Sequence, residues 1–407
     1  MSQPKLRVAA ALALVIFAGL LAAPRLVPQG QLAAPEPAVT ADEGTSGEFL
    51  VARPDFEWSF PRDHFKHDGY RTEWWYFTGH LESSEGKRFG YQFTFFRVGV
   101  RPGRWGRVEG ASAWETNNLL MGHASISSID SGTHVFSEML YRESPLLGRF
   151  HPFEAPPDDP TTNVGWARAP AGTDAPWTLS WEDGDDEGFA FSMSDQRQGV
   201  RFALKTRPLK PLVFQGPNGL SRKGRSDDAA SQYYSFTRLE TVGSLEMDGE
   251  THLVTGQSWM DKEFSSSQLT AGQVGWDWFS LQFEDGTELM LYRLRREDGS
   301  TDYANATFVP TDGEPRYLGT DAWSLESLDT WTSEETGATY PSAWRLRLDG
   351  QAWEIRPAMS DQENRSRIPG GVYYWEGAVR VTALGPGPEG LGYVELTGYG
   401  ENNRPPV

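Results

Sequence analysis

Apolar and polar residues alternate along short stretches of the chain. Residues 74–96 contain two such stretches, WWYFTGHLE and RFGYQFTFF, on either side of a polar Ser-Ser-Glu-Gly-Lys turn. Alternation with a period of two predicts β-strands, and a short turn containing Gly between two of them predicts a hairpin. Beyond the N-terminus, no long apolar stripe with a helical period follows. The pattern therefore predicts an all-β protein.

A second hairpin of the same design occurs about 200 residues later, in GWDWFSLQFEDGTELMLYRLR, residues 275–295. The two hairpins align when Trp74 is placed on Trp276, with a slip of two residues in the turn. One hairpin at the same place in two halves of a chain indicates a duplicated β domain. The other coinciding pairs are Phe77 with Phe279, Glu82 with Glu284 and Gly86 with Gly286.

Further short strands are predicted along the chain, and turns rich in Gly and Asp separate most of them. This spacing is typical of antiparallel barrels and sandwiches. Residues 207–228 are rich in Pro, Gly, Lys and Arg, and we place the boundary between the halves near Ser231–Thr241. We expect one β domain at 55–232 and a second at 233–407. The candidate strands are Leu119–Ile129, Trp177–Trp181, Gly188–Met193, Val200–Thr206, His252–Trp259, Trp344–Leu348, Ala352–Pro357, Tyr373–Thr382 and Gly392–Tyr399.

The beginning of the chain has the design of an export signal. Lys5 and Arg7 precede an unbroken apolar run, Val8–Ala23. The run is slightly long for a signal peptide and slightly short for a membrane-spanning helix. We therefore expect a periplasmic or secreted protein, and the sequence leaves open whether residues 1–23 are removed or remain as an inner-membrane anchor. Residues 24–54, rich in Pro, Ala, Gly and acidic residues, are expected to form a flexible linker.

Charge and cysteine content exclude several classes of function. The 407 residues include 56 acidic and 37 basic ones, which gives a formal net charge of −19. Such an acidic surface repels phosphate backbones, so we expect no nucleic-acid partner. Cysteine is absent, which excludes disulfides, thiolate zinc sites and cysteine nucleophiles.

The stretch HDGYRTEWWYFTGHL, residues 67–81, is the first candidate site. One face of its predicted strand carries Leu81 and three other residues typical of a packed core, Trp75, Phe77 and Gly79. The opposite face carries Trp74, Tyr76, Thr78 and His80. Aromatic rings with polar tips suit the wall of a ligand cavity, so Trp74, Tyr76 and His80 are candidate ligand-binding residues. The alternative is that they are packing residues and a hydrogen-bonded histidine.

The second candidate site combines SWMDKEFSSSQL, residues 258–269, with the GWDWF that follows. A carboxyl group beside indoles loses solvation, which raises its pKa and lets it act as a general acid near neutral pH. We assign this role to Asp261, with Glu263 on the same strand face as a second proton or water site. The neighbouring ligand-binding candidates are Trp259, Trp276, Asp277 and Trp278. The alternative is that these carboxylates are structural, bonded to backbone amides or paired with Arg293 and Arg295.

Metal binding is not expected. His67, Asp68 and Glu73 crowd a single turn before one strand, whereas zinc and non-haem iron sites need ligands that converge from rigid elements. The other histidines are scattered, and no glycine-rich phosphate loop occurs. We therefore expect neither a metal nor a cofactor.

Six segments, taken in order, resemble the motifs of a known family. From about residue 55 to 400 the chain resembles the AttH-type proteins, a family that also contains the carotenoid 1,2-hydratases, or hydroxyneurosporene synthases. The resemblance implies two lipocalin-like β-barrel domains packed together, in a protein of the kind called a predicted secreted hydrolase. The segments are EWWYFTGHL (73–81), QYYSFTRL (232–239), SWMDKEFSSSQL (258–269), GWDWFSLQFEDGTELMLYRLR (275–295), YYWEGAV (373–379) and GYVELTGY (392–399).

The resemblance also suggests catalytic residues. The carotenoid hydratases carry Asp-His-x-Trp where this chain has DKEF (261–264), and Tyr-x-Asp where it has YRL (292–294). Only Asp261 and Tyr292 match. The resemblance therefore implies a catalytic role for these two residues, without the His, the Trp and the second Asp of the hydratases.

Two hypotheses follow for function. In the first, the protein is an exported enzyme of the hydratase or hydrolase type that binds an apolar, lipid-like or polyene molecule and uses Asp261 as acid. In the second, it is a non-catalytic carrier or an accessory protein of an inner-membrane transporter. An enzyme needs a carboxyl with a shifted pKa that faces the cavity, whereas a carrier needs only apolar walls and neutral hydrogen bonds.

Overall fold

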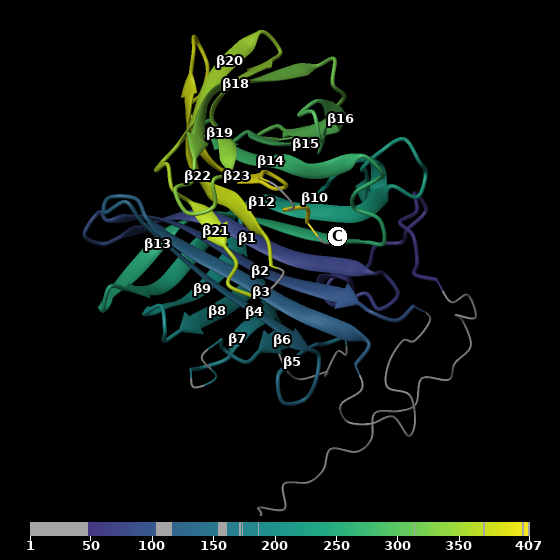
Figure 1. Ribbon diagram of the computed structural model, residues 1–407, viewed down its shortest axis with the longest axis vertical. Coiled ribbons are helices and arrows are strands. Elements are labelled where there is room, and N and C mark those ends of the chain that lie inside the picture. Colours follow the sequence, from purple (N-terminus) through teal and green to yellow (C-terminus); the bar gives the residue numbers. More distant parts are fainter. Residues whose placement is uncertain are drawn as a thin grey trace, which may run out of the picture. The chain divides into compact units, whose positions relative to one another are not determined.

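The computed structural model describes residues 48–102, 116–153, 161–170, 172, 174–185, 187–312, 314–368, 371–400 and 403–405. Within these ranges the chain forms two antiparallel β-sheets and two single-turn 3₁₀ helices, η1 (Arg62–His64) and η2 (Pro217–Gly219), and it contains no α-helix. One sheet curls into a nearly closed barrel and the other into a half-barrel (Figure 1). The predicted all-β class with two antiparallel β domains is confirmed.

The first sheet surrounds the larger hydrophobic core, and its strands run in the order β4-β3-β2-β1-β13-β12-β9-β8-β7-β6-β5. Two short strands, β10 and β11, pair with β12. The bounds are β1 (Thr72–Ser83), β2 (Arg88–Gly99), β3 (Asn118–Ser128), β4 (Thr133–Arg142), β5 (Gly148–Phe150), β6 (Thr161–Ala167), β7 (Trp177–Glu182), β8 (Gly188–Asp195), β9 (Val200–Pro208), β10 (Val213–Phe214), β11 (Leu220–Arg222), β12 (Ala230–Met247) and β13 (Glu250–Ser265).

The second sheet encloses a core of its own and has the strand order β17-β16-β15-β14-β23-β22-β20-β19-β18, with β21 paired to β22. The bounds are β14 (Gln273–Phe283), β15 (Glu288–Arg296), β16 (Thr301–Val309), β17 (Arg316–Leu318), β18 (Trp323–Thr332), β19 (Thr339–Leu348), β20 (Gln351–Pro357), β21 (Glu363–Arg365), β22 (Tyr373–Ala383) and β23 (Gly390–Leu396).

The two hairpins found in the sequence supply the first two strands, in chain order, of the two sheets. β1 and β2 form the first hairpin, and β14 and β15 form the second. In each sheet the first strand also pairs with the last one, β1 with β13 and β14 with β23. The two hairpins thus hold the same place in the strand order of the two sheets.

The chain passes from the first sheet to the second between Ser265 and Gln273. The boundary expected near Ser231–Thr241 falls within β12, which pairs with β9 and β13 of the first sheet. The physical reason is that β12 and β13 carry apolar side chains into the first core, among them Tyr234, Phe236 and Met260.

The expected signal segment, residues 1–23, lies outside the described residues, as does the expected linker up to residue 47. Among the residues that are described, no helix has the length and apolar character needed to cross a membrane.

Alternation along β1 places its two faces as the sequence predicts. Trp75, Phe77 and Leu81 are buried in the first core. Trp74 and Tyr76, on the other face, contact a separate aromatic cluster to which both sheets contribute. Between the sheets, a ring nitrogen of His123 on β3 also lies 2.8 Å from the hydroxyl of Tyr374 on β22. The face of β1 that turns away from the core therefore forms part of the junction between the sheets.

Candidate active site between the two sheets

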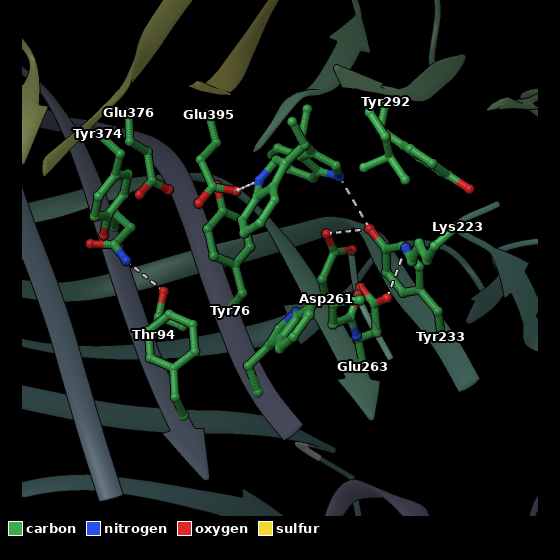
Figure 2. A pocket seen from close by; sticks show the side chains of 17 residues that line it. Tyr76, Thr94, Lys223, Tyr233, Asp261, Glu263, Tyr292, Tyr374, Glu376 and Glu395 are labelled. Carbon is green, nitrogen blue, oxygen red and sulfur yellow. Dashed lines mark hydrogen bonds and ion pairs between the residues drawn. The ribbon is translucent and has the colours of Figure 1, made fainter. Parts of the chain in front are cut away.

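A cavity of about 90 Å³ lies at the junction of the two sheets. Both sheets supply its walls, and aromatic rings alternate there with carboxyl groups (Figure 2). The lining residues are Trp74, Tyr76, Gln92, Thr94, Phe96, Lys223, Tyr233, Asp261, Glu263, Gln268, Trp276, Trp278, Tyr292, Leu294, Tyr374, Glu376 and Glu395.

Four of the ligand-binding candidates, all aromatic, line this cavity: Trp74, Tyr76, Trp276 and Trp278. Trp74 and Tyr76 are two positions apart on β1, as Trp276 and Trp278 are on β14, so alternation turns each pair to one face of its strand. The rings of Tyr76 and Trp278 meet edge to face, with centroids 5.2 Å apart. Facing strands from the two sheets therefore give the cavity an apolar wall on each side.

Asp261, on β13, lies at the cavity wall and is 3% exposed. The indole N–H of Trp259 donates to its Oδ1 at 2.7 Å, and the hydroxyl of Tyr233 donates to its Oδ2 at 2.7 Å. Ser235 supplies a third donor, to Oδ1. Burial outweighs these three hydrogen bonds and raises the pKa of Asp261 to about 7. The carboxyl can therefore give or take a proton near neutral pH.

Tyr233 links Asp261 to the second sheet. Its hydroxyl accepts a hydrogen bond from the indole N–H of Trp278 at 3.2 Å while it donates to Asp261. Tyr233 is itself buried, and burial together with the charges of Asp261 and Glu263 raises its pKa well above the usual value. The phenol therefore stays neutral and holds the Asp261 carboxyl in a fixed orientation.

Glu263 and Tyr292, the other two candidate catalytic residues, also line the cavity. Glu263 Oε1 lies 2.8 Å from Nζ of Lys223, a buried lysine whose ammonium group is also 4.6 Å from the centre of the Tyr292 ring. The Tyr292 hydroxyl donates to the backbone carbonyl of Arg222. Glu263 is thus paired with a cation, and Asp261 lacks such a partner among the described residues.

Three other candidates lie outside the cavity lining. Trp259 is buried and donates a hydrogen bond to Asp261. A ring nitrogen of His80 is 2.8 Å from the backbone carbonyl of Gly392, so His80 joins the two sheets, and burial lowers its pKa to about 4. Asp277, between Trp276 and Trp278 in the sequence, points to the opposite face of β14.

The partners of Asp277 are cations and a phenol. Its carboxylate oxygens lie 2.6 Å from Arg293 Nε and 2.7 Å from Arg295 Nε, and the hydroxyl of Tyr399 donates to it at 3.0 Å. The side chain is fully buried. This is the ion-pair alternative that the sequence left open for the carboxylates of this cluster.

Of the residues weighed as a metal site, Glu73 and His67 belong to a buried ionic cluster, whereas Asp68 is partly exposed and pairs with Lys66 at 3.1 Å. Glu73 accepts hydrogen bonds from Arg97 Nε at 2.7 Å and from the ammonium group of Lys262, and a ring nitrogen of His67 lies 2.8 Å from its Oε1. These neighbours hold the pKa of Glu73 well below its usual value although it is buried. Over the described ranges, no group of three or more His, Asp and Glu side chains is arranged to hold a metal ion.

The cavity also contains carboxyl groups that the sequence analysis did not select. Glu376 on β22 and Glu395 on β23 line it from the second sheet, opposite Asp261 (Figure 2). Both occur in the quoted motifs YYWEGAV and GYVELTGY, each as a carboxylate at mid-strand with a Tyr two positions earlier. These two residues could have been selected from the sequence, because each is a carboxylate on the same face of a predicted strand as a Tyr.

Comparison with known proteins identifies the family to which the chain belongs. A family model described as AttH-like matches residues 51–399. The crystal structure of a Nitrosomonas europaea protein described as an AttH is 33% identical in sequence, and the match covers 86% of this chain and all of that one with a TM-score of 0.73. No curated protein matches.

A more distant likeness concerns the fold alone. The crystal structure of kievitone hydratase from Nectria haematococca is 14% identical, with 87% of this chain and 94% of that one covered and a TM-score of 0.55. The match of the family model over most of the chain, together with the Nitrosomonas protein, confirms the resemblance found in the sequence motifs. The chain belongs to the AttH-like family.

Proposed function

We propose that the protein is an exported enzyme of the hydratase or hydrolase type. It binds an apolar, lipid-like or polyene molecule at the cavity between the two sheets and uses Asp261 as its proton donor. One observation carries this proposal: a carboxyl whose pKa is raised to about 7 faces a cavity walled by aromatic rings. General acids work best when their pKa lies near the working pH.

Hydration of a C=C bond fits these residues. The protonated carboxyl of Asp261 gives its proton to one alkene carbon, whose π electrons form the new C–H bond. The positive charge left on the other carbon is stabilised by the faces of the surrounding aromatic rings, such as that of Trp278. The oxygen of a water molecule then bonds to that carbon and the water loses a proton. One protein with this fold is named a hydratase, which makes hydration the first reaction to test.

The alternative function is that of a carrier or of an accessory protein to an inner-membrane transporter. A carrier gains nothing from burying acidic groups in its binding site, because each buried charge costs free energy unless it is paired. This cavity contains three carboxyl groups with raised pKa values, Asp261, Glu376 and Glu395. The cost of burying them favours the enzyme.

Product analysis in heavy-oxygen water tests the proposal. The protein is incubated with a panel of apolar alkenes, namely squalene, oleate and an acyclic carotenoid, and the products are examined by mass spectrometry for addition of one labelled water. The parent is expected to convert at least one probe. Asp261→Asn is expected to lose this turnover by about 100-fold or more, as expected for loss of a general acid, while its affinity for the probe changes only a few-fold because the side-chain shape is kept.

A matched control comes from the surface of the second sheet. Glu354 on β20 forms an exposed ion pair with Arg356, so Glu354→Gln removes one carboxylate without reaching the cavity and should keep full turnover. If the parent binds the probes but converts none of them, and Asp261→Asn binds them equally well, the carrier is the correct function and Asp261 is a structural carboxyl.

A further inference from the structure

A pair of carboxyl groups stands on the second sheet across the cavity from Asp261. Glu376 on β22 and Glu395 on β23 are direct neighbours in the register of the two antiparallel strands. Residues opposite each other in this way have Cβ atoms about 5 Å apart, on the same face of the sheet. Both side chains line the cavity, and Glu376 is 1% exposed. Ionisation of both carboxyls would therefore place two like charges together where there is little water.

Few groups are available to neutralise this pair. Lys223 is the single cation among the lining residues, and it already forms an ion pair with Glu263, with 2.8 Å between Lys223 Nζ and Glu263 Oε1. The indole N–H of Trp276 donates to Glu395 Oε2 at 2.8 Å, and the Asn364 amide reaches Glu376 Oε2 at 3.4 Å. The titratable groups that face the pair are Tyr76 on β1, Asp261 and Glu263 on β13, Tyr374 on β22 and Tyr393 on β23.

Two buried hydrogen-bonding atoms, Glu376 Oε1 and the Tyr76 hydroxyl, stand next to the cavity at the pair. Glu376 Oε1 has no hydrogen-bond partner of good geometry, although it is buried. The same is true of the hydroxyl of Tyr76, a lining residue that is 7% exposed. Buried polar atoms in native proteins are nearly always paired, and these two side chains interact with each other, so a water bound between them would complete the hydrogen bonding of both.

Electrostatics assign different states to the two carboxyls. Burial, with the repulsion from Glu395 added, raises the pKa of Glu376 well above its usual value. Burial also raises the pKa of Glu395, to about 7, although the indole of Trp276 favours its ionised form. The Trp276 N–H lies 2.8 Å from Glu395, whereas the Asn364 amide lies 3.4 Å from Glu376, so a negative charge is better stabilised on Glu395 and the proton of the pair belongs on Glu376.

We propose that Glu376 and Glu395 carry a single proton between them and that Glu395 is the catalytic base that takes the proton from the reacting water, opposite Asp261. This inference rests on the proposed function. Glu376, the protonated member, is a positioning residue, which together with the Tyr76 hydroxyl orients the water.

The proton balance of the reaction is complete with these residues. Asp261 loses its proton to one alkene carbon and becomes a carboxylate. The water oxygen bonds to the other carbon, and one water proton passes to the Glu395 carboxylate, which becomes a carboxylic acid. The product is the alcohol. Proton exchange with solvent returns Glu395 to the ionised form and Asp261 to the protonated form, so that nothing is oxidised or reduced.

Infrared difference titration of the purified protein tests the shared proton without any substrate, because protonated carboxyls absorb apart from carboxylates. The parent should retain a protonated-carboxyl band at neutral pH. Asp261→Asn removes the contribution of Asp261 to this band. In that background, Glu376→Gln should remove the band that remains and leave the titration of Glu395 nearly unchanged, because one neutral group replaces another. Glu395→Gln should instead move the titration of Glu376 to lower pH, because it removes the neighbouring negative charge. Glu354→Gln is the control and should match the parent.

Turnover of the alkene probe converted best by the parent tests the base. Glu395→Gln should lower kcat by about 100-fold or more with little change in KM, as for loss of a general base. Glu376→Gln should lower kcat less and change the pH dependence of the rate. If the parent is active and Glu395→Gln keeps its kcat within a few-fold, the base assignment is wrong and the proposed function stands.

Two other outcomes are decisive. If the parent shows no protonated-carboxyl band at neutral pH, or if both glutamine variants leave the band unchanged, the single shared proton is refuted whether or not turnover is found. If no probe is converted by the parent, the assignment of Glu395 as base is rejected together with the proposed function, and the infrared titration still decides the protonation of the pair.

Discussion

Substitution of Asp261 by Asn should change how the stability of the protein depends on pH. The pKa of this carboxyl rises from 3.8 to about 7 on folding. A raised pKa stabilises the folded state below the unfolded-state value, and this stabilisation is lost as the pH rises through the folded-state value. The parent therefore loses stability between about pH 4 and about pH 7 as Asp261 is forced to ionise in a buried place.

The size of the effect follows from the shift. About three pKa units at about 1.4 kcal/mol each correspond to about 4 kcal/mol of unfolding free energy, as an upper bound. The variant keeps a neutral side chain of the same shape at every pH. Its amide oxygen can accept from Trp259, and its amide N–H can donate to the Tyr233 hydroxyl. Removal of the Asp261 charge also lowers the pKa of Glu395, which adds an effect of the same sign.

Urea unfolding followed by tryptophan fluorescence provides the measurement, at several pH values between about 4 and 8. The difference in unfolding free energy, variant minus parent, should grow with pH by up to about 4 kcal/mol and then level off above about pH 7. Effects of all other groups that titrate equally in both proteins cancel in this difference. Parallel pH profiles for the two proteins, within about 0.5 kcal/mol, would refute the buried, proton-holding carboxyl on which the proposed function rests.

Three further predictions concern the cavity wall, the buried ion pairs and export. Trp74→Ala should weaken binding of an apolar probe by about 1–3 kcal/mol through lost apolar contact; an unchanged Kd in fluorescence quenching would remove Trp74 from the binding site. Asp277→Ala should destabilise the fold by about 3–5 kcal/mol in urea, because Arg293 and Arg295 lose their partner in a buried place; a loss below about 1 kcal/mol would contradict a structural role. Residues 1–54 fused to alkaline phosphatase should give an active reporter, and an inactive, cytoplasmic fusion would reject export.

Strand faces and part of the site chemistry could be predicted from the sequence because they depend on neighbouring residues. Alternation along β1 separated Trp75 from Trp74 correctly, since successive side chains of a strand point to opposite faces whatever the partner strand is. The sequence also predicts the raised pKa of Asp261 from the neighbouring residues. Trp259, two positions away in the sequence, is one of the hydrogen-bond donors to the carboxyl, and burial outweighs the lowering of the pKa by these donors.

The fate of Asp277 shows where local pattern fails. Its neighbours in the sequence, Trp276 and Trp278, resemble those of Asp261, but the odd position on β14 turns its side chain to the opposite face, where two arginines of β15 neutralise it. For a related reason, the sequence did not show where the first sheet ends and the second begins. A loop rich in Pro and Gly marks a break in the strands, and it does not tell which sheet the following strands will join.

The sequence by itself determined an all-β protein with two hairpins of one design and an acid placed among indoles. Only the tertiary structure decided that Glu376 and Glu395 stand side by side and that both face Asp261 across a cavity. The reason is physical. The face on which a side chain lies is fixed within a few residues, whereas its opposite neighbour depends on the register of strands far apart in the chain and on the packing of one sheet against the other.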